Sequence, residues 1–335
     1  MKKFDFLVTG GAGFIGSNFV RHILENTDKS VAVADSLTYS SNLGSLAGLD
    51  SSRFKLFEVD IRTSEKLLPL FDKVDTVVHF AAESHNDNSL HSSKVFLDTN
   101  VVGTYNVIEA IRITGKRLHH ISTDEVFGDL AINDTKKFNE NSRYQPSSPY
   151  SATKAASDLL VNAWIRSFGI NATISNCSNN YGPRQHVEKF IPRQITNLAI
   201  GKPAVLYGSG KNVRDWIHVD DHSSAVLKII NSGKLGETYL IGAHGEKSNL
   251  EVLKSILNIM GRSSDEYIHI EDRPGHDLRY AIDYSKLSQT LGWKPKFTDF
   301  EQGLEKTIDW YLSNENWWRE SKVKAENYYR DLGQA

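Results

Sequence analysis

The chain of 335 residues has one cysteine, two methionines and eight prolines. A single cysteine excludes an internal disulfide framework, which fits a reducing compartment. The chain has 39 Lys and Arg residues and 41 Asp and Glu residues. This balance argues against an overall positive charge that would attract nucleic acid or a membrane surface. No apolar run approaches the roughly 20 residues of a membrane span, and we expect no signal peptide. The 12 His show no metal-ligand spacing. We therefore expect a cytoplasmic globular protein with no metal site and no nucleic-acid or membrane partner.

Short apolar runs alternate with longer helical patterns through the first half of the chain. Because these runs are mostly apolar rather than alternating, they fit parallel strands covered on both faces. This alternation predicts an α/β fold with a Rossmann-type, doubly wound parallel sheet. The expected strands are Phe4–Thr9, Val31–Asp35, Phe54–Val59, Thr76–Phe80, Leu118–Ser122 and Ala172–Asn176, and the expected helices include Ile15–Glu25, Lys94–Thr114 and Tyr150–Phe168.

The pattern changes near Asn180, where Gly, Pro and Arg become more frequent. We expect a dinucleotide-binding domain over residues 1–180 and a smaller α/β substrate-binding lobe over 181–335, with strands crossing this soft boundary. A terminal helix over Glu315–Ala335 is expected to pack on the core, with an oligomer contact as the alternative. Shorter strands are expected at Ala204–Tyr207, Trp216–Val219, Thr238–Ile241 and Tyr267–Ile270.

A glycine-rich loop follows the first expected strand and opens a helix. Gly10, Gly13 and Gly16 lack the Cβ atoms that would keep the backbone away from a pyrophosphate, and the helix N-terminus offers free N–H groups. Asp35 ends the second strand about 20 residues further on, where a carboxylate can bind a ribose diol. Because no Arg follows Asp35 to pair with a 2′-phosphate, NAD is favoured over NADP. Asp60-Ile61 is a candidate for the adenine end, although an Asp that merely ends a strand explains it equally well.

Tyr150 and Lys154 stand four residues apart at the start of an expected helix, directly after Pro149. A phenol with a pKa near 10 is a poor base at neutral pH, but a neighbouring ammonium group and a positive nicotinamide ring favour the phenolate. Tyr150 can then take a hydroxyl proton while hydride leaves the same carbon. Together with the glycine loop, this pair resembles the short-chain dehydrogenase/reductase superfamily, in the extended branch that acts on nucleotide sugars. The resemblance covers nearly the whole chain.

Two adjacent acids, Asp124 and Glu125, follow Thr123 at the end of the fifth expected strand. Ligands of open α/β sheets bind at this edge. Burial or like charge can keep one carboxyl neutral while the other stays ionised, which provides a proton donor beside a proton acceptor. A solvated pair of loop acids is the alternative.

The run Ile121–Asp129 resembles the active-site strand of the dTDP-glucose 4,6-dehydratase family. Nucleotide-sugar 4-epimerases share the fold but carry small neutral residues where Asp124 and Glu125 stand. The resemblance implies conversion of dTDP-glucose to dTDP-4-keto-6-deoxyglucose by C4 oxidation, loss of water across C5 and C6, and hydride return to C6. The alternatives are a 4,6-dehydratase for another nucleotide hexose, a 4-epimerase or decarboxylase, or a silent NAD-binding sensor. Similar stretches stand at residues 35–39, 79–85, 178–183 and 272–277.

The resemblance also implies a role for each catalytic side chain. Tyr150 takes the O4 proton, Thr123 hydrogen-bonds O4, and Lys154 holds the nicotinamide ribose. Glu125 removes the C5 proton, and a protonated Asp124 donates to the departing C6 hydroxyl. Spacing alone leaves the acid and base assignment open, since a coupled pair titrates as a unit.

Positions that match the family's binding residues form two sets, one for NAD and one for the nucleotide sugar. Arg214 and Lys189 are the cations expected at the diphosphate, and residues 205–207 are expected at the base. The expected NAD-binding residues are Gly10, Gly13, Phe14, Ile15, Gly16, Asp35, Ser36, Leu37, Thr38, Asp60, Ile61, Phe80, Ala81, Ala82, Ser84, Thr99, Tyr150, Lys154 and Asn180. The expected substrate-binding residues are Ser84, Thr123, Asn179, Lys189, Phe190, Val205, Leu206, Tyr207, Arg214, Asn249, Asp272, Arg273, Gly275 and His276.

The sequence departs from the family pattern in the run Asn86-Asp87-Asn88-Ser89-Leu90, where Val-Asp-Arg-Ser-Ile is usual. The missing Arg leaves the contacts of this loop open. Phe127 and Val187 stand where Tyr and Pro are usual. The resemblance further implies a homodimer, paired through the helices expected over Lys94–Thr114 and Tyr150–Phe168.

Overall fold

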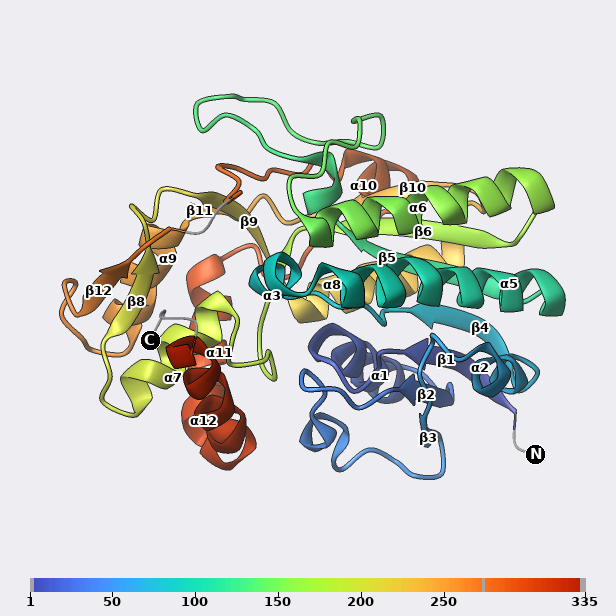
Figure 1. Cartoon of the computed structure of the whole chain (residues 1–335), viewed down its shortest axis with the longest axis horizontal. Helices are drawn as coiled ribbons and strands as arrows, with labels where there is room; N and C mark the ends of the chain where they lie inside the picture. The colour runs from blue at the N-terminus through green and yellow to red at the C-terminus, as the bar shows by residue number, and fades with distance from the viewer. Residues whose placement is uncertain (1–2, 273–274, 332–335) are drawn as a thin grey trace.

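The computed structural model describes residues 3–272 and 275–331, and within these ranges seven strands form one parallel sheet in the order β10-β6-β5-β4-β1-β2-β3 (Figure 1). Every neighbouring pair is parallel, as the apolar runs predicted. The expected Rossmann-type sheet is confirmed. Its strands are β1 (Phe4–Thr9), β2 (Val31–Asp35), β3 (Phe54–Glu58), β4 (Val74–His79), β5 (Arg117–Thr123), β6 (Ala172–Cys177) and β10 (Thr238–Ile241).

Helices cover both faces of this sheet because successive strand side chains point to opposite sides. On β1, Phe6 and Val8 join one core cluster with α1 and α8, whereas Leu7 between them joins the other with α2, α5 and α6. The sheet is thereby buried on both sides and exposes only its edges and strand ends. The helices are α1 (Phe14–Asn26), α2 (Ser64–Phe71), α5 (Thr104–Thr114), α6 (Pro149–Phe168) and α8 (Val219–Ser232).

The helix expected over Lys94–Thr114 is interrupted, which corrects the sequence prediction. A short α4 (Ser93–Phe96) leads into a π-helical segment, η2 (Leu97–Gly103), before α5 begins. Within η2, Asn100 bonds both the backbone N–H and C=O of Glu83 and donates to the Thr153 hydroxyl at 3.0 Å. π-bulges are common at functional sites, and this one fixes the loop that follows β4 against α6.

A second lobe lies beside the carboxyl edge of the sheet (Figure 1). The chain returns from this lobe to the main sheet, since α8 packs on α1 and β10 pairs with β6. The division at residue 180 therefore stays a prediction. The strand expected at Trp216–Val219 begins earlier and ends one residue sooner, and Val219 opens α8. The lobe contains β7 (Asn179–Tyr181), β8 (Ala204–Tyr207), β9 (Val213–His218), β11 (Glu246–Ser248), β12 (Tyr267–Ile270), α7 (Phe190–Ala199), α9 (Asn249–Ile259) and α11 (Phe300–Ser313).

The C-terminal helix α12 (Glu315–Asp331) packs on this lobe, as the aromatic pattern predicted. Trp318 is buried, and the Arg193 guanidinium lies 3.7 Å from the centre of the Tyr329 ring. The Trp317 carbonyl accepts a hydrogen bond from Asn42, so α12 also touches the loop after β2. Residues 332–335 of the expected helix and the Tyr328 side chain lie outside the described residues. The remaining elements are η1 (Leu43–Leu46), α3 (Asn86–His91), η3 (Asp124–Phe127) and α10 (Ser285–Leu291).

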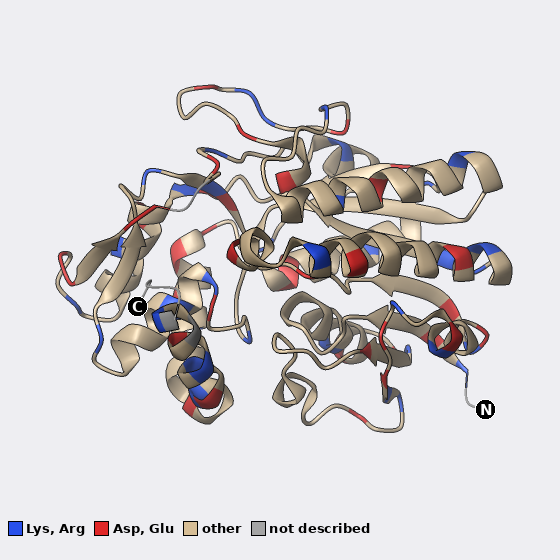
Figure 2. Ribbon diagram, in the orientation of Figure 1, with Lys and Arg blue, Asp and Glu red and all other residues tan. Residues whose placement is uncertain are grey.

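Charged residues of both signs are interspersed over both lobes (Figure 2). Among residues 3–272 and 275–331, no helix is long and apolar enough to cross a membrane. No group of three or more His, Cys, Asp or Glu side chains in the same ranges could hold a metal ion.

Candidate active site

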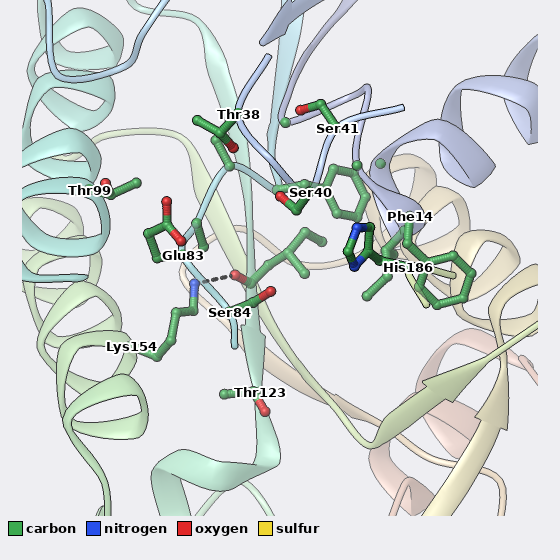
Figure 3. A pocket seen from close by; sticks show the side chains of 18 of the residues that line it. Phe14, Thr38, Ser40, Ser41, Glu83, Ser84, Thr99, Thr123, Lys154 and His186 are labelled. Atoms are coloured by element: carbon green, nitrogen blue, oxygen red, sulfur yellow. Dashed lines mark hydrogen bonds between the residues drawn. The ribbon is translucent and has the colours of Figure 1, made fainter. Parts of the chain in front are cut away.

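A deep pocket runs along the carboxyl ends of the parallel strands, where α/β folds bind ligands (Figure 3). In Figure 3, Phe14 at the start of α1 lies to the right of the pocket, Lys154 to the left and Thr123 below. Five expected catalytic residues and most of the expected NAD set share this cavity. The lining includes Gly10, Gly13, Phe14, Ile15, Gly16, Asp35, Ser36, Thr38, Asp60, Ile61, Phe80, Ala81, Ala82, Ser84, Thr99, Thr123, Asp124, Glu125, Tyr150, Lys154 and Asn180.

The glycine loop has a geometry that only missing side chains permit. Gly10 has φ +69°, and a Cβ there would lie 2.7 Å from the Ala81 backbone. A Cβ on Gly16 would lie 2.2 Å from the Gly10 carbonyl oxygen. Gly13 caps α1 without a side chain, so the first N–H groups of the helix face the pocket. This loop fits the pyrophosphate of a dinucleotide.

Asp35 is buried at the end of β2 and organises the neighbouring loop. Its carboxylate accepts hydrogen bonds from the N–H groups of Ala12 and Leu37 and from the Ser41 hydroxyl, each at 2.8 Å. Ionised carboxylate oxygens together accept about four bonds, so acceptor capacity remains for a ribose diol. Leu37 was expected to contact NAD, but its side chain packs against the core and does not line the pocket.

The adjacent acids lie where β5 ends and η3 begins. The Thr123 hydroxyl donates to Asp124 Oδ1 at 3.2 Å and accepts from the Glu125 N–H at 3.3 Å. Burial of Asp124, and then the nearby charges of Glu125 and Asp215, raise the pKa of the Asp124 carboxyl well above its usual value. Both effects favour the protonated form of Asp124 beside Glu125.

Tyr150 lies in the first turn of α6, which Pro149 and a Ser148–Ser151 capping box start. Burial, and then the charge of Glu125, raise the pKa of Tyr150 well above 10. Burial also lowers the pKa of Lys154, whose Nζ donates to the Ile121 carbonyl at 2.8 Å. Burial thus opposes the phenolate in the protein alone, and the expectation that Lys154 and a bound nicotinamide ring together favour it stays a prediction. A positive ring bound beside Tyr150 would act in the opposite direction.

Several buried polar atoms at the pocket lack a hydrogen-bond partner within the described part of the chain. Buried polar groups are normally bonded, so such atoms point to a ligand. They lie at the end of β5, in η3, and from the residue before β7 to the loop after it, and all five residues line the pocket. They are Ser122 Oγ, Asp124 Oδ2, Ser178 Oγ, Asn179 Oδ1 and Gln185 Oε1.

The expected substrate residues divide between the pocket and the second lobe. Arg214 is buried, donates to the carbonyls of Val213 and Asp277, and stacks 4.3 Å from the Tyr280 ring centre. The Leu206 side chain is fully buried in the lobe core, which argues against contact with a base. Arg273 lies outside the described residues. Ser84, Thr123, Asn179 and Lys189 line the pocket, whereas Phe190, Val205, Leu206, Tyr207, Arg214, Asn249, Asp272, Gly275 and His276 do not.

The structure adds pocket residues that the sequence analysis did not single out. Arg62 lines the pocket and pairs with Asp60, with 2.6 Å between Nη2 and Oδ2. Glu83 has its pKa raised by burial and by the charge of Glu188, which also lines the pocket. Arg62 and Glu83 both stand next to residues that the sequence analysis expected at NAD. Their position beside those residues was the signal that could have identified them. Ser40, Ser41, Gln185 and His186 are further additions.

Comparison with known proteins agrees with this geometry. A sequence profile described as GDP-mannose 4,6 dehydratase matches residues 7–307. The dTDP-glucose 4,6-dehydratase of Mycobacterium tuberculosis is 57% identical over 329 residues, which cover 98% of this chain and 99% of the relative. The Escherichia coli enzyme of the same name is 48% identical, with 93% of each chain covered. The chain belongs to the dTDP-glucose 4,6-dehydratase family.

Solved structures extend the comparison to the fold. DesIV, a dTDP-glucose 4,6-dehydratase from Streptomyces venezuelae solved with NAD bound, superposes with a TM-score of 0.91 at 42% identity, covering 95% of this chain and 99% of DesIV. A UDP-glucose 4-epimerase from Thermotoga maritima superposes with a TM-score of 0.86 at 26% identity. The superposition covers 93% of this chain and 99% of the epimerase. The family thus shares its fold with epimerases, so the fold alone does not separate the two reactions.

Proposed function

We propose that this enzyme dehydrates dTDP-glucose to dTDP-4-keto-6-deoxyglucose with NAD as its cofactor. The observation that carries the proposal is the pairing of the buried Asp124 with Glu125 in the same pocket as Thr123, Tyr150 and Lys154. The glycine loop and Asp35 occupy the same pocket and fit a dinucleotide. Family relatives at 46–58% identity carry this name.

The first step is oxidation at C4 of the hexose. Bound NAD supplies a hydride acceptor, and returns the hydride later. Tyr150 takes the proton of the O4 hydroxyl, with the Thr123 hydroxyl as a hydrogen-bond partner of that oxygen. Lys154 is anchored to Ile121 and would hold the nicotinamide ribose while its charge favours the phenolate. The resulting ketone acidifies the proton on C5.

The second step is loss of water across C5 and C6. Glu125 removes the C5 proton, and the C5–H electron pair forms the C5–C6 double bond as the C6–O bond breaks. Asp124 gives its proton to the departing hydroxyl, which leaves as water. Burial of Asp124 raises the pKa of its carboxyl and so favours the protonated form that this step needs. Hydride return to C6 and a proton at C5 complete a reaction without net redox change.

The nucleotide end is proposed to lie between the pocket and the second lobe. Lys189 lines the pocket, and its Nζ donates to the Ser84 carbonyl at 3.0 Å, so one expected cation already bridges the two parts of the fold. Arg214 is preorganised by Asp277 and Tyr280. Both would face the diphosphate through charge-assisted hydrogen bonds.

A homodimer is proposed from one partly apolar helical surface. Leu97, Val102 and Tyr105 on the η2–α5 helix and Leu159 on α6 are all exposed, and Leu159 is 59% accessible. The two helices lie side by side on the same face of the sheet (Figure 1). Large exposed apolar residues on adjacent helices suit a helical dimer interface. Leu159→Asp is expected to yield monomers in light scattering, whereas an unchanged mass would contradict this surface.

A cytoplasmic location is also proposed. Cys177 is a free thiol in the core, and burial raises its pKa to about 12, so it remains a small apolar residue. The chain therefore needs no oxidising compartment to fold.

A turnover panel tests the substrate. The purified enzyme with NAD is incubated with dTDP-, UDP-, GDP- and CDP-glucose and with GDP-mannose, and 4-keto-6-deoxy product is measured. We expect product from dTDP-glucose above all others. Product from another nucleotide alone would overturn the specificity, and 4-epimerised sugar without water loss would favour the epimerase alternative.

A further inference from the structure

Asn86 donates a hydrogen bond from its side-chain Nδ2 to Oε2 of Glu125 at 3.0 Å. Asn86 opens α3 in the loop after β4, and Glu125 lies in η3 after β5. Two neighbouring strands thus each contribute one partner, and the contact lies at the wall of the pocket that Glu125 lines. An ionised carboxylate only accepts hydrogen bonds, so the amide nitrogen is the group that must face it.

The backbone that carries this amide is held by further hydrogen bonds. The Ser89 hydroxyl donates to the main-chain carbonyl oxygen of Asn86 at 2.6 Å and lies 3.5 Å from the side-chain Oδ1 of Asn86. Ser89 is buried. His85, the residue before α3, caps this helix because its side chain accepts a hydrogen bond from the Asn88 N–H. Lys189 also holds the loop through the Ser84 carbonyl. The donor therefore reaches Glu125 from a fixed backbone rather than from a free surface loop.

The surroundings explain why a neutral donor suits this position. Asp124, Tyr150 and Tyr280 all face Glu125, and its negative charge raises the pKa of each of them. Arg214 acts in the opposite direction on Asp124 and Tyr280. A lysine near Glu125 would lower the pKa of Asp124 as well and release the proton that the acid must keep. An amide stabilises the carboxylate by one directed bond without adding charge.

We propose that Asn86 is a positioning residue that keeps Glu125 ionised and aimed at the substrate C5 proton, so that the two neighbouring carboxyl groups keep opposite protonation states. The inference rests on the proposed function, in which Glu125 is the base. A Val at this position, as in the family pattern from which the sequence departs, has no donor. In this chain the base therefore gains a partner that the pattern does not supply.

The test uses the full-length enzyme with NAD and dTDP-glucose, comparing Asn86→Leu and Asn86→Val with the parent. Stopped-flow absorbance of reduced cofactor separates C4 oxidation, which raises the signal, from elimination and hydride return, which remove it. We expect oxidation within twofold of the parent and decay slowed on the order of tenfold. The acidic limb of the pH profile for decay is expected to move toward higher pH, because the carboxylate has lost a donor that favours its charged form.

Asn88→Leu is the matched control, because it removes an amide from the same helix that donates to the Tyr39 hydroxyl at 3.2 Å. It is expected to keep the parental decay rate and pH profile. Parental kinetics in both Asn86 variants would overturn the inference. Equal losses of oxidation and decay, or an equal effect of Asn88→Leu, would also overturn it, since they indicate a purely structural loop. A parent enzyme that makes no product from dTDP-glucose would instead refute the proposed function.

Discussion

Lys154 Nζ donates to the main-chain carbonyl of Ile121 at 2.8 Å, which ties the catalytic helix α6 to β5 two residues before Thr123. Tyr150 lies one turn earlier on the same helix, and the adjacent acids follow on the same strand. The oxidation residues and the elimination residues are therefore positioned by buried contacts between α6 and β5, among them the bond between His120 Nε2 and Asp158 Oδ1 at 3.1 Å. This relationship suggests how each half of the reaction can be disabled separately.

Replacing Lys154 with Met should remove the positive charge that favours the Tyr150 phenolate. We expect C4 oxidation to fall by about 10²–10⁴-fold at pH 7, the range typical of a lost proton-transfer group. Because burial already raises the pKa of Tyr150, the variant should regain rate as pH rises, more steeply than the parent. The measurement is the rate of reduced-cofactor formation from pH 6 to pH 10. Parallel pH profiles for parent and variant would contradict this role.

Changing Glu125 to Gln should separate oxidation from elimination. The amide keeps the size of the side chain but cannot take the C5 proton, so reduced cofactor should accumulate while 4-keto-6-deoxy product falls by about 10²–10⁴-fold. Loss of deuterium from a C5-labelled substrate provides an independent measure of proton removal. An unchanged dehydration rate in this variant would show that Glu125 is not the base.

Gly16→Ala should prevent cofactor binding, because the new Cβ would lie 2.2 Å from the Gly10 carbonyl. The loop must then open, which we expect to cost about 1–3 kcal/mol in stability and most of the bound NAD. Gly201→Ala is the control, since Gly201 has φ +76° and open space around its Cβ position. It should lose about 1–2 kcal/mol from backbone strain alone and keep its NAD. The measurement is the amount of NAD released when the purified protein is denatured. Full NAD occupancy in Gly16→Ala would contradict a role of the glycine loop in cofactor binding.

Local sequence signals predicted the parallel sheet and the glycine loop, because each depends on spacing within one strand–loop–helix unit. The expected catalytic set came from the family resemblance, and the structure brings its five residues into one pocket. Contacts between distant segments were not predictable in this way. The bond from Asn86 to Glu125 spans 39 residues, and the sequence gives no signal for which strands become neighbours. The π-helical turn around Asn100 was also missed, since helical periodicity does not register one extra residue in a turn. Leu206 was misplaced because a strand pattern does not say which face a second lobe covers.

Asp215 offers a pH-dependent test of the buried charges behind the active site. It is fully buried, accepts the Gly245 N–H at 2.8 Å, and burial raises its pKa from 3.8 to about 6. A carboxyl with a raised folded-state pKa binds its proton more tightly when folded, so its contribution to stability is complete below about pH 4 and is lost as pH rises through 6. Asp215→Asn mimics the protonated form. It should match the parent at pH 4 and exceed it by about 2–3 kcal/mol at pH 8 in urea unfolding. A variant that is less stable than the parent at pH 8 would show that Asp215 is held as a charged partner instead.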